Sequence, residues 1–196
     1  MTDVEWAAAR AVAHGHHDSG DEYCVRPFEH RMLIAVIDGL GHGTAAADVA
    51  RQGVRLLEQA RTSDVVQLVH ECHDGLRGSR GLVMSLAMFD GPASTMTWVG
   101  VGNVSGTLWR AHSPDRQTLL LRRGLVGDAL PRLEVSVVPV SEGDTLVFTT
   151  DGVVENIDDR MMQGSSVQII ADRILAHGNK GHDDALALVA RYKGGA

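Results

Sequence analysis

The chain has 196 residues, of which 44% are hydrophobic and 4% aromatic, and its formal net charge is −7. This length fits a single domain over residues 1–196, with a core built from Val, Leu, Ile, Ala and Met. There is no run of Lys or Arg that could follow a phosphate backbone, and no apolar stretch of the roughly 20 residues that a membrane span needs, so we expect neither nucleic acid nor a membrane as partner.

The cysteines and the N-terminal residues point to a reducing compartment. Cys24 and Cys72 are too few and too far apart for a zinc site or a disulfide framework. Asp3 and Glu5 come before any apolar run, which argues against a signal peptide. The cytoplasm is therefore the expected location.

Apolar periodicity and turn residues predict the following elements in chain order. We expect strands first, at 4–12, 22–26 and 31–37. A glycine-rich turn at 38–43 then leads into a helix over 44–59, and a second helix begins near Ser63 and Asp64 with an N-cap residue. Further strands are expected at 82–89, 95–101, 104–110, 118–121, 133–139 and 145–150, followed by a helix at 166–176 and a last strand at 185–192.

This order separates the helices from strands that are mostly joined as hairpins. Such segregation indicates an α+β fold with antiparallel sheets. Two helices after the first strands and another near the end can cover both faces of a sandwich.

Acidic residues stand at the ends of several predicted strands. Asp21 precedes a strand, whereas Asp38 and Asp151 each follow an apolar strand and open a turn with glycine. Asp183 and Asp184 lead into the last strand. Carboxylates at neighbouring strand ends can converge, and Mg²⁺ and Mn²⁺ prefer oxygen ligands. Because aspartate before glycine is also a common turn residue, the residues alone leave open both a metal centre and a set of turns.

Together, the motifs resemble the metal-dependent serine/threonine phosphatases of the PPM superfamily. The motifs, in order, are Ser19-Gly20-Asp21, VIDGLGHG at 36–43, TTDGVVE at 149–155 and Asp183-Asp184. The short length, Arg80-Gly81 and GVGNV at 100–104 look most similar to the SpoIIE-like branch, and within it to the small stressosome feedback phosphatases of RsbX type. The resemblance spans nearly the whole chain, and it implies a four-layer αββα sandwich of two mainly antiparallel sheets flanked by helices.

The same resemblance implies a centre of two Mn²⁺ or Mg²⁺ ions. Asp38 would bridge the ions, and the carbonyl group of Gly39 would be a further ligand. Asp151 and Asp183 would bind the first ion, and Asp21 would serve the second, directly or through water. The family therefore predicts a site built from residues that are far apart in the sequence.

By this resemblance the chain is a protein serine/threonine phosphatase. Asp38 and Asp151 would act in catalysis through a metal-activated water. Asp184 would orient the neighbouring ligand more readily than bind an ion. The expected partner is a phosphorylated STAS-domain regulatory protein of a stressosome or partner-switching pathway, and we expect a monomer. The alternative is a pseudophosphatase that binds a phosphoprotein without turnover.

Some positions depart from the family pattern. Eukaryotic relatives carry a phosphate-binding arginine before the first acidic motif, whereas residues 13–18 here contain none. Asn103 stands where many relatives have an aspartate for a third ion, which makes a third ion doubtful. His42 can either donate a proton to the leaving group or serve the turn. His14, His16 and His17 can bind a transition metal or be solvated.

Overall fold

The computed structural model describes residues 2–154, 156–162 and 166–195. Glu155, which ends the predicted motif at 149–155, lies outside the described residues. One sheet has the strand order β1-β11-β10-β6-β7, and the other has the order β2-β3-β4-β5-β8, with β9 also paired to β5. The strands of the first sheet are β1 (Thr2–Ala11), β6 (Ser105–Trp109), β7 (Arg116–Thr118), β10 (Thr145–Thr149) and β11 (Ala185–Gly195). Those of the second are β2 (Asp21–Phe28), β3 (Arg31–Gly39), β4 (Leu82–Asp90), β5 (Thr95–Val101), β8 (Leu121–Arg122) and β9 (Val135–Pro139).

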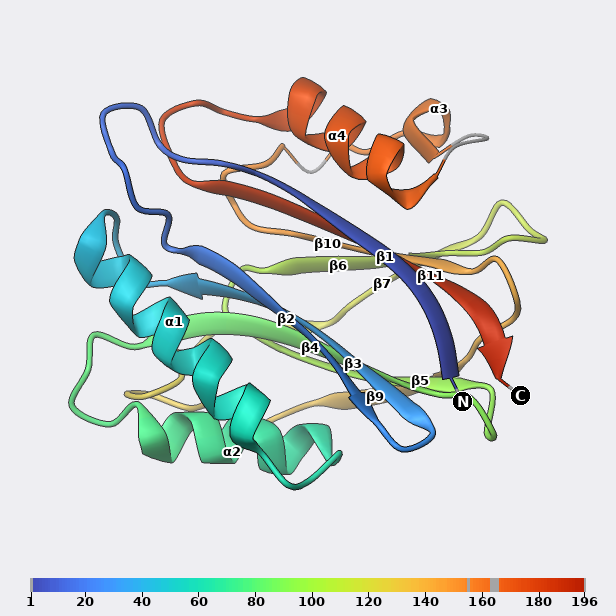
Figure 1. Cartoon of the computed structure of the whole chain (residues 1–196), viewed down its shortest axis with the longest axis horizontal. Coiled ribbons are helices and arrows are strands. Elements are labelled where there is room, and N and C mark those ends of the chain that lie inside the picture. The colour runs from blue at the N-terminus through green and yellow to red at the C-terminus, as the bar shows by residue number, and fades with distance from the viewer. Residues whose placement is uncertain (1, 155, 163–165, 196) are drawn as a thin grey trace.

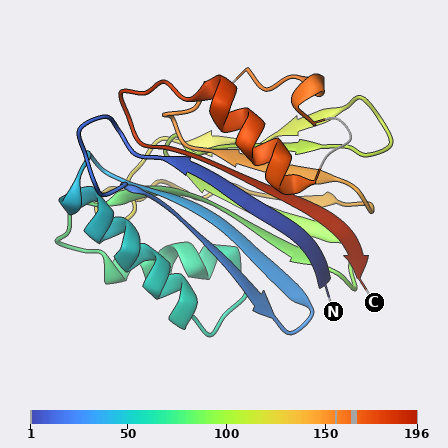
Figure 2. The ribbon, with the colours of Figure 1, turned by 45° about the horizontal axis from the view of Figure 1, so that its top comes forward.

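Helices cover the outer face of each sheet, so the molecule is a four-layer αββα sandwich (Figures 1 and 2). Helices α1 (Thr44–Gln59) and α2 (Val65–Gly75) lie on the β2–β5 sheet. Helix α4 (Val167–Gly178) lies across β1 and β11, and the short helix α3 (Asp159–Met162) precedes it. The predicted fold class is confirmed.

Three hydrophobic clusters fill the spaces between the layers. In β3, Leu33 and Ile37 pack toward α1 and α2, while Ile34 and Val36 pack between the sheets. In β11, alanines 185 and 187 face α4, and leucines 186 and 188 face the other sheet. Because both faces of these strands are buried, they read as continuous apolar runs and not as alternating patterns.

Most of the predicted elements are present with small changes at their ends. The predicted helix at 44–59 has those bounds, and Asp64 caps α2 by accepting hydrogen bonds from the backbone N–H groups of Val66 and Gln67. The strand predicted at 118–121 was wrong, because this stretch is divided between β7 and β8, and β8 pairs with β5 in parallel. Its backbone crosses from one sheet to the other: the Leu119 N–H donates to the carbonyl oxygen of Gly106 in β6, and the N–H of Gly102, just after β5, donates to the carbonyl oxygen of Arg122.

Helix α3 was not predicted. It has four residues, none of them buried, and so it has no apolar face that periodicity could reveal. Cys24 and Cys72 are both buried and free. None of the helices in the described residues combines the length and hydrophobicity that crossing a membrane requires.

Candidate metal centre

Two of the predicted ligands face each other across the β2–β3 pair. Asp21 begins β2 and lies opposite Asp38, the next-to-last residue of β3. The Asp21 side chain is buried, with 2% of its surface exposed, and accepts a hydrogen bond of 2.6 Å from the hydroxyl of Thr150. Thr150 directly follows β10, so the contact joins the two sheets at the end where Asp151 begins the next turn.

Burial and mutual repulsion make these carboxyl groups hard to ionise. Burial and, after it, the charges of the other four aspartates, Asp21 foremost among them, together raise the pKa of Asp38 to about 8. Burial also raises the pKa of Asp21 to about 7, against the Thr150 hydrogen bond, with Asp184 the largest repulsive charge. The pKa of Asp38 responds to all four of the other aspartates, and that of Asp21 responds to Asp184, Asp151 and Asp183, so the structure brings the predicted set into one neighbourhood.

Asp151 lies at the solvent-exposed side of this neighbourhood. The side-chain amide of Asn103 donates a hydrogen bond of 2.6 Å to its Oδ2 atom. Burial raises the pKa of Asp151, and Asp183 raises it further, whereas Lys180 and the Asn103 hydrogen bond act in the opposite direction. Asn103 therefore orients a predicted ligand through its amide.

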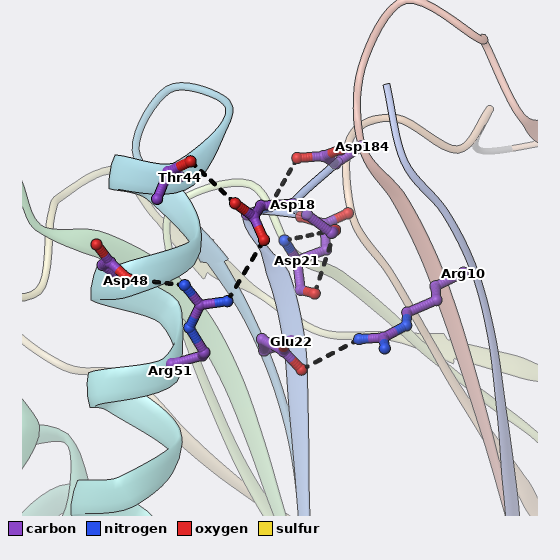
Figure 3. Close-up of polar contacts among 10 residues, drawn as sticks. Arg10, Asp18, Asp21, Glu22, Thr44, Asp48, Arg51 and Asp184 are labelled. Atoms are coloured by element: carbon purple, nitrogen blue, oxygen red, sulfur yellow. Dashed lines mark hydrogen bonds and ion pairs between the residues drawn. The ribbon is translucent and has the colours of Figure 1, made fainter. Parts of the chain in front are cut away.

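Asp184 is occupied by the backbone of the loop that leads into β2. Its two carboxylate oxygens accept hydrogen bonds from the N–H groups of Ala13 (2.8 Å) and Gly20 (2.7 Å). Figure 3 shows Asp184 directed at the segment just before Asp21. Asp183, beside it, accepts a bond only from the Asp184 backbone N–H among the contacts of the described residues. This arrangement supports Asp184 as the residue that positions the loop and Asp183 as the ligand.

The same loop is also fastened to helix α1 (Figure 3). Asp18 accepts a hydrogen bond of 2.9 Å from the Thr44 hydroxyl, and it lies 3.8 Å from the Arg51 guanidinium. Thr44 is the first residue of α1. The segment before Asp21 is thus held from both sides.

Two glycines allow the turns to approach each other this closely. A Cβ atom on Gly39 would lie 2.3 Å from the carbonyl oxygen of Ala46, and one on Gly152 would lie 1.9 Å from that of Asp184. Any larger residue would push the β3 turn off helix α1 or the Asp151 turn off β11. The Gly39 N–H also bonds to the Gly20 carbonyl at 2.9 Å, which fixes the β3 turn to the loop before Asp21.

The chemistry of these donors fits hard divalent cations, because carboxylate and carbonyl oxygens are what Mg²⁺ and Mn²⁺ bind. Among the described residues, however, no three or more His, Cys, Asp or Glu side chains stand arranged as a group that could hold an ion. Some of the carboxylate oxygens accept hydrogen bonds from the protein instead: Asp21 accepts one from Thr150, and Asp151 accepts one from Asn103. A bound ion would compete with these hydrogen bonds, so the side chains must turn to form a ligand set.

The aspartate cluster differs from the rest of the surface by its concentrated negative charge, whereas a large cavity lies elsewhere. A cavity of about 530 Å³ lined by Trp109, Arg110 and Arg191 lies at the other end of β6 and β10. Its cations already have partners, for example Asp144 for Arg110 at 2.8 Å. We therefore assign the chemistry to the aspartate end of the sandwich.

Sequence reasoning missed Thr150 and Lys180 as parts of this site. Thr150 lies within a predicted motif, but its hydroxyl contacts a residue 129 positions away. Among the histidines, the His16 and His42 rings lie 4.8 Å apart between centroids, which places His42 against the loop before Asp21. This contact supports neither a transition-metal site nor a proton donor in particular.

We expect Asp184→Ala to unfold at a lower temperature than the wild type, by about 5 °C or more at pH 6. It removes two buried hydrogen bonds to a carboxylate, each worth about 1.5–3 kcal/mol, and about 1 kcal/mol shifts the Tm of a chain this size by about 2–4 °C. Differential scanning calorimetry checks this, with Asp183→Ala as the matched control that keeps the wild-type Tm. A stable Asp184→Ala beside an unstable Asp183→Ala would reverse the two roles.

The four-layer αββα sandwich of this chain is the fold of the PP2C-type domains. The PP2C phosphatase domain of SpoIIE from Bacillus subtilis superposes with a TM-score of 0.80 at 20% identity, over 98% of this chain and 64% of that one. The chain belongs to the SpoIIE family, since the model of Stage II sporulation protein E matches residues 29–193.

The chain is also similar to individual members of this family and to solved structures. The phosphoserine phosphatase RsbX of Bacillus subtilis (strain 168) is 24% identical over 168 residues, which are 84% of this chain and 83% of that protein. A crystal structure of RsbX in complex with magnesium has a TM-score of 0.86 at 20% identity and covers 98% of this chain and all of that one. A chain from a structure described as "The bacterial stressosome: a modular system that has been adapted to control secondary messenger signaling" has a TM-score of 0.90 at 26% identity, over 96% of this chain and 100% of that one.

Proposed function

We propose that this chain is a metal-dependent protein phosphatase that hydrolyses phosphoserine or phosphothreonine on a regulatory protein. The observation that carries the proposal is the cluster of aspartates, drawn from four distant segments, in which burial and mutual repulsion raise the pKa of Asp38 to about 8 and that of Asp21 to about 7. A protein gains from such costly carboxylates where they bind cations. The RsbX relative, named as a phosphoserine phosphatase, supports the same reaction class.

The residues of the chain would hold two Mn²⁺ or Mg²⁺ ions through Asp38, the Gly39 carbonyl, Asp21, Asp151 and Asp183. Such ions, when bound, supply a water activated as nucleophile and neutralise the phosphoryl oxygens. Asn103 would keep the Asp151 carboxylate oriented, and Thr150 would do the same for Asp21. Asp184 would hold the backbone before Asp21 in place.

We infer that residues 1–196 act as one domain in the cytoplasm. Strands from opposite ends of the sequence support the single domain, because β1 pairs with β11 over the whole of β1, from Thr2 to Ala11. The sheet that carries Asp151 and Asp183 at its end therefore depends on residues from both ends of the sequence.

We infer further that the substrate is a folded phosphoprotein, of STAS-domain type, in a stressosome or partner-switching pathway. The RsbX likeness and the likeness to the stressosome chain support this class of partner. The loop at 124–133 is fastened to the body: Val126 pairs with Leu82 in β4, and the Gly127 N–H donates to His73 of α2 at 3.0 Å. A loop held down in this way cannot enclose a small substrate, so selectivity must come from a wider contact surface.

We expect kcat/KM on a phosphorylated STAS-domain protein to exceed that on its phosphosite peptide by at least about tenfold, because contacts outside the phosphoserine add about 1.4 kcal/mol or more in the transition state. Steady-state kinetics on both substrates, at matched Mn²⁺ and ionic strength, measure this ratio, and p-nitrophenyl phosphate gives the basal rate. Equal values would confine recognition to the phosphoserine. Tight binding of the phosphoprotein without turnover of any substrate would instead identify a pseudophosphatase.

A further inference from the structure

Lys180 is fixed beside the Asp151 turn by the backbone of the loop that joins α4 to β11. Its N–H donates to the Gly152 carbonyl at 3.0 Å, and the Val154 N–H donates to the Gly178 carbonyl at 2.8 Å. Val153 and Asn179 also form a β-bridge. These contacts hold the loop on the same turn that carries Asp151.

The side chain of Lys180 returns to that turn as well. Its ammonium donates a hydrogen bond of 2.5 Å to the backbone carbonyl oxygen of Asp151. The residue is exposed to solvent, as is Asp151. An ammonium has three donors, so the carbonyl bond leaves two for an arriving acceptor.

A cation at this place matters because the neighbourhood is otherwise acidic. The carboxylates of Asp151 and Asp183 lie there and offset the charge of the cations that they would bind, so a phosphoester dianion gains from a further positive charge beside them, in a chain with a net charge of −7. The positive charge of Lys180 lowers the pKa of Asp151, whereas the negative charge of Asp183 raises it. Residues 13–18, before the first acidic motif, contribute no arginine.

We propose that Lys180 binds the phosphoryl group of the substrate from the Asp151 side of the site. The inference rests on the proposed phosphatase function and adds a substrate-binding residue to it. An exposed ammonium fixed at its backbone and at its tip loses little freedom when it meets a phosphate oxygen. Removing its charge should therefore weaken phosphate binding while easing the binding of cations at Asp151.

The test compares Lys180→Met with Lys180→Arg and with Lys193→Met. Lys180 and Lys193 are the only lysines of the chain. Lys193 is exposed near the other end of β11, about 27 Å from its start at about 3.4 Å per residue, so the control makes the same change in charge away from the site. Inhibition by inorganic phosphate, KM and kcat on p-nitrophenyl phosphate, and the Kd for Mn²⁺ by calorimetry are measured for each protein.

For Lys180→Met we expect the inhibition constant of phosphate and the KM to rise about tenfold, with kcat changed less than about threefold, because one charged hydrogen bond to the phosphate is lost. The Kd for Mn²⁺ should stay the same or fall. Lys180→Arg should recover most of the loss, and Lys193→Met should match the wild type.

Unchanged phosphate inhibition in Lys180→Met overturns the proposal. So does a parallel loss of Mn²⁺ affinity and phosphate affinity, because that result would mean that Lys180 only fastens the Asp151 turn. A wild type without phosphatase activity would defeat the proposed function itself. A wild type that is active, with Lys180→Met identical to it, would defeat only the role of Lys180.

Discussion

We expect Asp38→Asn to lower kcat/KM by at least about a thousandfold, because bound metal ions contribute several kcal/mol to stabilising the transition state. Asp38 lies at the end of β3 opposite Asp21, and its pKa of about 8 responds to every other carboxylate of the cluster. The substitution keeps the shape of the side chain and removes its charge. The activity of the purified variant on p-nitrophenyl phosphate with Mn²⁺ measures the loss.

The fold should survive this change. With its metals removed, the Asp38→Asn protein should be more stable than the wild type at pH 8, by at least a few degrees in Tm. The asparagine is neutral and ends the repulsion that Asp21 and its neighbours exert at position 38. Circular dichroism checks the fold, and Asp172→Asn on α4, where Asp172 accepts a bond from Gln168, is the matched control with full activity. Near-wild-type activity in Asp38→Asn would contradict the two-metal centre.

Treatment with EDTA should abolish activity, and Mn²⁺ or Mg²⁺ should restore it, whereas Zn²⁺ alone should not. All-oxygen ligands suit hard cations with nearly octahedral coordination, and the site offers neither a thiolate nor a grouped set of imidazoles among the described residues. Activity titrations against each metal after dialysis test the order. Full activity in a chelated sample would rule out the metal mechanism.

The same metal-free protein should lose stability as the pH rises from about 4 to about 8. The pKa values of Asp21 and Asp38, about 7 and about 8, lie above their ordinary value of 3.8, so the folded chain holds protons that the unfolded chain has released. Asp21 and Asp38 therefore destabilise the folded state least below about pH 4 and most above about pH 8. The carboxylates must be charged to bind Mn²⁺, and they are charged more fully at pH 8 than at pH 5. Mn²⁺ should therefore raise the Tm far more at pH 8 than at pH 5. Equal shifts at the two pH values would contradict this linkage.

Much of the fold could be read from the sequence, because strands buried on both faces leave long apolar runs. Residues 31–37 and 185–190 are such runs, and both are central strands. The turn residues also predicted where strands end, as at Asp38 and Asp151. The boundaries failed at 116–122, where the chain changes sheets and only three-residue and two-residue strands remain.

The site could be predicted only in part, because its contacts join residues that are distant in the chain. The motif pattern gave the aspartates, and the structure places them together. The roles of Thr150, Asn103 and Lys180 depend on hydrogen bonds across 129, 48 and 29 positions, and no local pattern carries that information. The assignment between Asp183 and Asp184 likewise needed the bonds to Ala13 and Gly20.

The bonds of Asp184 also bear on the order of events during synthesis. They span 171 and 164 positions, almost the length of the chain, and β1 cannot take its place in the first sheet until β11 arrives. Contacts of such high sequence separation form late and slowly in folding. As the polypeptide leaves the ribosome, the segment before Asp21 must wait until Asp184 has been made. A chain interrupted anywhere before β11 should therefore have no assembled metal centre, and an incomplete copy of the enzyme would not remove phosphate from its target.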